Sequence, residues 1–125
     1  MQRGAIILCG GQSSRMGVDK ALLPFGDEKM LQRVVRIVGT QVTSKHTVVV
    51  ASSQQELPEL PTLVCRDDEE YRGPLAAMAR GLAALPNDVE AVFITGCDAP
   101  LLLPEVLDFL FAELGSADAD VPKDA

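Results

Sequence analysis

The stretch AIILCGGQSSRMGVDK, residues 5–20, joins a short apolar run to a loop that is rich in glycine and in cations. The run 5–9 is apolar and ends at a glycine, which is typical of a buried strand. Residues 10–20 then hold three glycines, two serines and two cations, Arg15 and Lys20. Glycine lets backbone N–H groups turn toward an anion, and Arg and Lys add charge-assisted hydrogen bonds. The stretch therefore predicts a strand followed by a loop that wraps phosphate groups.

This loop differs from the two common phosphate-binding motifs of α/β proteins. It has no Gly-Lys-Ser/Thr after a four-residue spacer, as a P-loop has, and no Gly-x-Gly-x-x-Gly of a dinucleotide-binding fold. The alternative interpretation is a solvated glycine-rich turn with incidental charges. The joint occurrence of glycines and cations favours anion binding.

The remainder of the chain alternates apolar runs with stretches of helical spacing. Further strands are predicted over residues 47–51, 62–65 and 91–95, and helices over residues 30–42, 74–85 and 104–114, the last ended by Gly115. This order predicts an α/β fold, a Rossmann-like, mostly parallel sheet with helices on both faces and right-handed crossovers. Ligands in such sheets bind at the carboxyl ends of the strands. Residues 54–61 are expected to form a surface connection, and 116–125 a disordered end.

Composition and charge exclude several classes of protein. The chain has 125 residues, 47% of them hydrophobic, and a net charge of −7, which argues against nucleic-acid binding. Seven Lys and Arg against three acids precede residue 54, whereas four against fifteen follow it, so an anion is favoured by the first half. The odd number of cysteines indicates a reduced, cytoplasmic protein, and no apolar run is long enough to span a bilayer. His46 is expected on the surface.

Three segments together carry a family resemblance. They are the glycine-rich loop with Leu22-Leu23-Pro24-Phe25-Gly26 after it, Asp67 followed by Gly73-Pro74-Leu75-Ala76, and Cys97-Asp98-Ala99-Pro100. The chain resembles the molybdenum cofactor guanylyltransferase family and its nucleotidyltransferase relatives. The resemblance implies a sheet of the nucleotide-diphospho-sugar transferase type. It also implies that residues 1–125 are one nucleotidyltransferase domain that is truncated at its C-terminus, with the acceptor-binding part missing.

The resemblance also implies roles for particular residues. Leu8, Cys9, Gly10 and Gly11 match the loop for the base and phosphates, Lys20 matches the lysine that contacts the triphosphate, Asp67 matches a nucleotide-contacting aspartate, and Asp98 matches the aspartate that holds Mg²⁺. Independently of the family, an acid just past an apolar strand lies where a hard oxygen ligand meets magnesium and phosphate. A turn or helix-cap aspartate is the alternative for Asp98. Where the family often has a polar amide this chain has Ala51, so Ser52 or Ser53 supplies that contact, or nothing does.

The function implied is transfer of GMP from GTP to molybdopterin, with release of pyrophosphate. Arg15, Lys20 and Asp98 are the expected catalytic residues, Mg²⁺ the cofactor, and GTP and molybdopterin the partners, without nucleic acid or membrane. Two alternatives stay open: a cytidylyl or sugar-phosphate nucleotidyltransferase, and a nucleotide-binding module without transferase activity. The sequence leaves the oligomeric state open.

Overall fold

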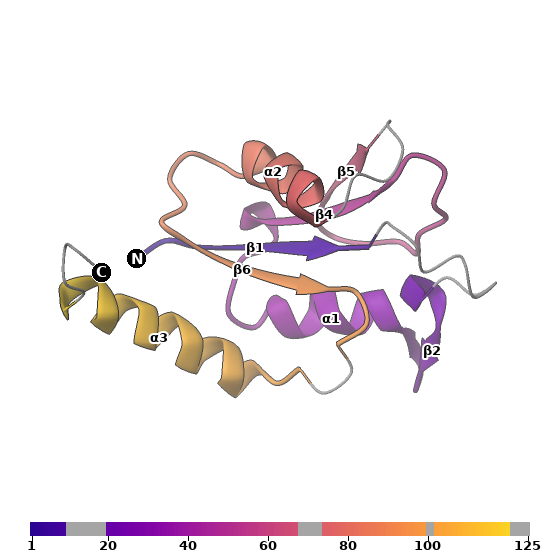
Figure 1. Cartoon of the computed structure of the whole chain (residues 1–125). Helices are drawn as coiled ribbons and strands as arrows, with labels where there is room; N and C mark the ends of the chain where they lie inside the picture. The colour runs from indigo at the N-terminus through magenta and orange to yellow at the C-terminus, as the bar shows by residue number, and fades with distance from the viewer. Residues whose placement is uncertain (10–19, 68–73, 100–101, 121–125) are drawn as a thin grey trace.

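A parallel four-stranded sheet forms the centre of the computed structural model, which describes residues 1–9, 20–67, 74–99 and 102–120. Its strands are β1 (Arg3–Leu8), β4 (Thr47–Ser52), β5 (Leu63–Asp67) and β6 (Ala91–Gly96), in the order β5-β4-β1-β6 (Figure 1). Every pair is parallel, so all four carboxyl ends lie at one edge of the sheet. The predicted strands are therefore confirmed, with ends that differ by one or two residues.

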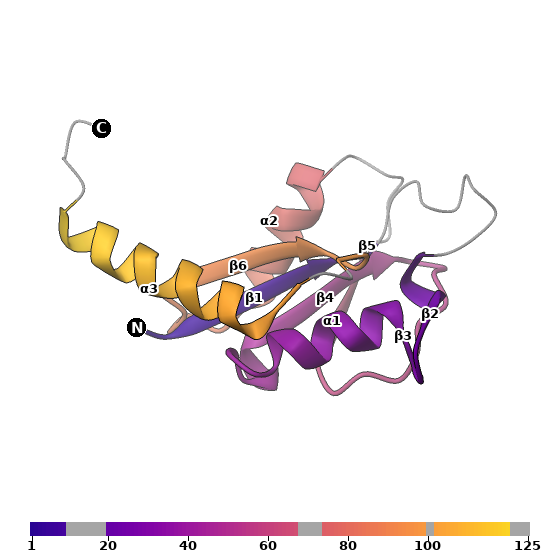
Figure 2. The same cartoon turned by 90° about the horizontal axis from the view of Figure 1, so that it is seen from below.

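Helices cover both faces of this sheet, as predicted. The helices α1 (Met30–Val38) and α3 (Pro104–Asp120) lie on one face, and α2 (Pro74–Ala84) lies on the other (Figures 1 and 2). Successive residues of a strand point to opposite faces. Ile7 accordingly packs in the core under α1 and α3, while Ile6 packs in the core under α2.

The face under α2 depends on a close approach of helix and strand. A Cβ atom added to Gly81 of α2 would lie 2.7 Å from Cγ2 of Ile6. Ile6 is fully buried in β1 and has no free space to withdraw into. The absence of a side chain at residue 81 thus sets how near α2 lies to the sheet.

The structure also differs from the predicted elements. Helix α1 ends at Val38 rather than at residue 42, and the hydroxyl of Thr40 donates to the carbonyl of Ile37 at 2.7 Å just past its end. Gly115 does not end α3, which continues to Asp120, so the expectation of a disordered tail is wrong for residues 116–120. Gly115 does not adopt the positive φ with which a glycine commonly ends a helix, since Gly26 is the only described residue with a positive φ.

A short hairpin precedes α1 and was not predicted. It pairs β2 (Pro24–Phe25) with β3 (Glu28–Lys29), with Gly26 at a φ of 65° in the turn. Two-residue strands are too short to show a periodic pattern. The hairpin is held to α1 by the Arg33 guanidinium, which lies 4.5 Å from the centre of the Phe25 ring.

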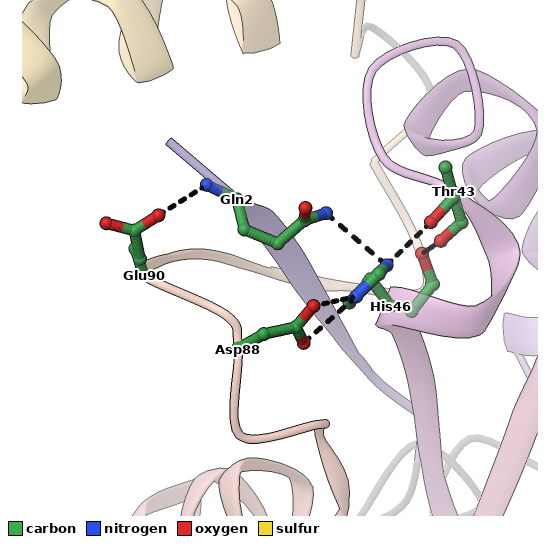
Figure 3. Close-up of polar contacts among 6 residues, drawn as sticks. Gln2, Thr43, His46, Asp88 and Glu90 are labelled. Atoms are coloured by element: carbon green, nitrogen blue, oxygen red, sulfur yellow. Dashed lines mark hydrogen bonds and ion pairs between the residues drawn. The ribbon is translucent and has the colours of Figure 1, made fainter.

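His46 is buried, with 4% of its surface exposed, so the expectation that it lies on the surface is wrong. Its Nε2 lies 3.2 Å from a carboxylate oxygen of Asp88, and its Nδ1 lies 2.7 Å from Oγ1 of Thr43 (Figure 3). Gln2 approaches the same Nδ1 at 3.4 Å. These contacts join the segments before β1, β4 and β6, at the sheet edge opposite the carboxyl ends.

Candidate functional site

The carboxyl ends of β1 and β6 meet side by side. Leu8 is in register with Gly96, and the N–H of Cys97 donates to the carbonyl of Leu8 at 3.1 Å. From β1 the chain proceeds outward through β4 and β5, and then returns to the opposite side of β1 as β6. Ligands of open α/β sheets bind at such a reversal of strand order. The fold thus defines this edge as the candidate site.

Asp98 lies at this reversal and exposes its side chain, while the preceding Cys97 is buried. A Cβ atom on Gly96 would lie 3.2 Å from Oδ1 of Asp98, so the carboxylate lies over the end of β6. Cys97 anchors the backbone, and the missing side chain at residue 96 leaves room for the carboxylate. Asp98 is thereby positioned next to the end of β1, where its predicted ligand would bind.

The residues present fit a magnesium ion. Mg²⁺ in nucleotide sites is held by one or two carboxylates together with phosphate oxygens and waters, and it needs no all-protein cage. Among the described residues no group of three metal-binding side chains occurs, and Asp98 supplies one exposed carboxylate at the ligand edge. This arrangement suits a metal that arrives with a phosphate-bearing substrate.

The other predicted site residues are distributed along the same edge or lie outside the described residues. Cys9 follows β1 and is buried, as expected of a small hydrophobe. Asp67 is the last residue of β5 and is in backbone register with Ser52 of β4. Lys20 is the first residue of a short 3-10 helix, Lys20–Leu22. The second residue of this helix, Ala21, is fully buried. Gly10, Gly11 and Arg15 lie outside the described residues.

Two further side chains at this edge were missed by the sequence analysis. The side-chain amide of Gln55 donates through Nε2 to the carbonyl of Cys9 at 2.9 Å. Arg66 donates through Nη1 to the carbonyl of Ser52 at 3.0 Å and also to the carbonyl of Gln55. Gln55 lies in the segment predicted as a surface connection, and no periodic pattern marks a side chain that returns to a strand distant in sequence. An amide does therefore reach this edge, from Gln55 rather than from residue 51.

The clearest electrostatic pair joins β3 to α1. Arg36 donates to Glu28 at 2.8 Å, and the hydrogen bond from its guanidinium lowers the pKa of the Glu28 carboxyl. The same bond raises the pKa of Arg36. A hollow of about 530 Å³ beside this pair is lined by α1 and residues 59–61, and it contains none of the predicted site residues.

A parallel four-stranded sheet with helices on both faces and an acidic residue at its strand-order reversal defines an α/β protein whose candidate ligand site lies at the carboxyl ends of the strands. A family model described as the MobA-like NTP transferase domain matches residues 5–124, and the chain belongs to this family. The resemblance seen in the sequence is thereby confirmed.

A named relative agrees in sequence with this assignment, and solved structures agree with the fold. A protein of Mycobacterium avium (strain 104), named probable molybdenum cofactor guanylyltransferase, is 38% identical over 124 residues, which cover 97% of this chain and 62% of that protein. The crystal structure of Rv0371c from Mycobacterium tuberculosis H37Rv matches with a TM-score of 0.75 and 20% identity, over 93% of this chain and 61% of that one. A structure of Rv0371c in complex with manganese matches with a TM-score of 0.64 and 17% identity, over 94% and 61% of the two chains. The chain thus spans about three fifths of the length of these relatives.

In the described part of the chain, no helix is both long and apolar enough to cross a membrane. Cys9, Cys65 and Cys97 form no disulfide with one another.

Proposed function

We propose that this chain binds GTP with Mg²⁺ and transfers GMP to molybdopterin, releasing pyrophosphate. The observation that carries the proposal is the exposed carboxylate of Asp98 at the end of β6, next to the end of β1, where the glycine-rich loop begins. Support comes from the family of the chain and from the name of its mycobacterial relative. We further propose that the protein acts in the cytoplasm, as the odd number of widely spaced cysteines suggests.

The proposed roles follow the order of strand ends along the edge. Residues 8–11 receive the base and the phosphates, and Asp67, two strands away, contacts the nucleotide. Lys20 and Arg15 neutralise the triphosphate, and Asp98 holds the metal ion. A magnesium ion bound there would supply charge neutralisation of the phosphate oxygens.

The reaction needs positioning more than proton transfer. An oxygen of the acceptor phosphate attacks the α-phosphorus of GTP in line, and the bond to the departing pyrophosphate breaks. The attacking oxygen is already anionic, so no strong general base is required. Lys20 and Arg15 stabilise the charge that moves to the leaving group, and catalysis rests on their placement.

Two other functions compete with this proposal. A cytidylyl or sugar-phosphate nucleotidyltransferase would use the same edge of the sheet, and the Gly10-Gly11 pair favours guanine by family resemblance. A nucleotide-binding module without transferase activity would keep the fold and lose the reaction. Retention of both Lys20 and Asp98 supports an enzyme.

The test is release of pyrophosphate from GTP and from CTP, each with Mg²⁺ and molybdopterin. Release from GTP that depends on molybdopterin supports the proposal. Release from CTP alone favours the cytidylyl enzyme. Nucleotide binding without release is expected both of a binding module and of a nucleotidyltransferase domain that lacks its acceptor-binding part. Parallel assays of a full-length relative determine whether acceptor binding needs more than residues 1–125.

A further inference from the structure

Both backbone polar groups of Cys9, the first residue after β1, accept or donate a hydrogen bond. Its N–H donates to the carbonyl of Val50 at 2.8 Å, a bond that continues the pairing of β1 with β4. Its carbonyl accepts from Nε2 of Gln55 at 2.9 Å. The second bond comes from a residue 46 positions later in the chain. The orientation of the Cys9 peptide is therefore fixed before the chain enters residue 10.

Gln55 is itself held in place on two sides. Its Oε1 accepts from the N–H of Ser52 at 3.1 Å, and its own N–H donates to the carbonyl of Ser52 at 3.2 Å. Arg66 of β5 donates to the carbonyls of Ser52 and Gln55 and so clamps the turn between them. Arg66 is anchored in turn, because its own carbonyl accepts from Arg80 of α2 at 3.2 Å.

We propose that Gln55 is a positioning residue for nucleotide binding, acting through the carbonyl of Cys9. A continuous set of hydrogen bonds runs from Arg66 through the turn at Ser52 to Gln55 and then to Cys9, and it joins the carboxyl ends of β5, β4 and β1. The set fixes the direction in which the chain leaves β1 at the edge where the nucleotide is proposed to bind. The inference rests on the proposed function, and it adds a residue that contacts the binding strand rather than the nucleotide.

The amide group suits this task because it combines an acceptor with a donor. The acceptor oxygen meets the N–H of Ser52, and the donor nitrogen meets the carbonyl of Cys9. A glutamate of the same shape keeps the acceptor and loses the donor when ionised. A methionine of similar length loses both. The two substitutions therefore separate the bond to Cys9 from the bond to Ser52.

The experiment compares Gln55→Glu and Gln55→Met with Gln54→Glu and Gln54→Met. Gln54 is the exposed neighbour of Gln55, so its glutamate variant carries the same charge change close to the same place. The dissociation constant for GTP with Mg²⁺ is measured by calorimetry and expressed per folded molecule, with the folded fraction taken from thermal unfolding. We expect both Gln55 variants to bind GTP about three- to tenfold more weakly, because both lose the hydrogen bond to Cys9, and both Gln54 variants to bind as the unaltered chain does.

The outcomes separate the inference from the proposed function. If the unaltered chain binds no nucleoside triphosphate, the proposed function fails and the inference fails with it. If the unaltered chain binds GTP and the Gln55→Glu variant binds equally well, the inference alone is wrong. The inference is also overturned if only Gln55→Met weakens binding, or if both Gln55 variants lower the melting temperature while GTP affinity per folded molecule is unchanged.

Discussion

Asp98 and Lys20 are the two residues on which the proposed chemistry depends most. Asp98 exposes its carboxylate over the end of β6, while the neighbouring Cys97 is buried in the core. An exposed side chain contributes little to packing, so its replacement separates function from stability. Lys20 follows the glycine-rich loop and precedes the fully buried Ala21, which anchors the backbone there.

Replacement of Asp98 by asparagine removes the charge and keeps the shape. We expect Asp98→Asn to weaken Mg²⁺-dependent GTP binding and to lower turnover, with partial recovery at high Mg²⁺, while the melting temperature stays near that of the unaltered chain. Glu113→Gln, on the exposed part of α3, is the control for the loss of one negative charge. A large fall in melting temperature with a proportionate loss of activity would instead identify Asp98 as a structural cap.

Lys20→Ala tests the cation at the end of the loop. We expect GTP binding to weaken by about 1.5 to 3 kcal/mol, the range for hydrogen bonds to charged groups. Lys45→Ala, at an exposed position before β4, controls for the change in net charge. Calorimetry measures both affinities, and an unchanged GTP affinity in Lys20→Ala would remove this residue from the site.

At the scale of elements, close packing and local pairs hold the helices to the sheet. Helix α2 approaches β1 through Gly81 and Ile6, and the β2–β3 hairpin is joined to α1 by Arg33 over Phe25 and by Arg36 to Glu28. The first contact is buried and the others are at the surface. The contact between Gly81 and Ile6 should therefore be sensitive to side-chain volume, and the Arg36–Glu28 ion pair to pH.

Gly81→Ala should destabilise the fold although alanine is the better helix former. The added Cβ would lie 2.7 Å from a fully buried Ile6, and such overpacking costs about 1 to 3 kcal/mol, against a gain of about 1 kcal/mol in helix propensity. Denaturant unfolding measures the change. In an Ile6→Ala background the same substitution should cost less, because the obstructing methyl groups are gone. Equal costs in the two backgrounds would contradict the close approach of α2.

The Glu28–Arg36 pair should make stability depend on pH in the acid range. The pKa of Glu28 is lowered in the folded state, chiefly by the hydrogen bond from Arg36, so the pair stabilises the fold above the unfolded pKa of the carboxyl. This contribution is lost as the pH falls through the lowered pKa. We expect a small difference in melting temperature between the unaltered chain and Glu28→Gln at neutral pH, and its disappearance in acid. A difference that grows on acidification would contradict the assignment.

At the scale of the whole molecule, the sheet and its helices were predictable because their signals are local. The continuous run Thr47–Ser52 is typical of a buried strand, and the apolar stripe of α1 has the period of an amphipathic helix. The placement of Asp98 at the ligand edge followed from its position after such a strand. The prediction failed where Gly115 stayed helical, since a glycine stops a helix only when the chain turns there.

The remaining features depend on residues that are distant in sequence. His46 is buried because Gln2, Thr43 and Asp88 supply polar partners from three segments, and no local pattern predicts that meeting. Gln55 reaches Cys9 for the same kind of reason. Such contacts are determined by the fold as a whole, so they became visible only once the strand order was known.

We propose that the carboxyl edge of this sheet binds GTP in preference to other nucleotides. It is tested most directly by the thermal shift of the unaltered chain with GTP, ATP, CTP and UTP, each with Mg²⁺. A ligand that binds only the folded state raises the melting temperature according to its affinity. We expect the largest shift with GTP, and a smaller shift with GTP in Asp98→Asn. Equal shifts with ATP and GTP, or no shift with any of the four, would contradict it.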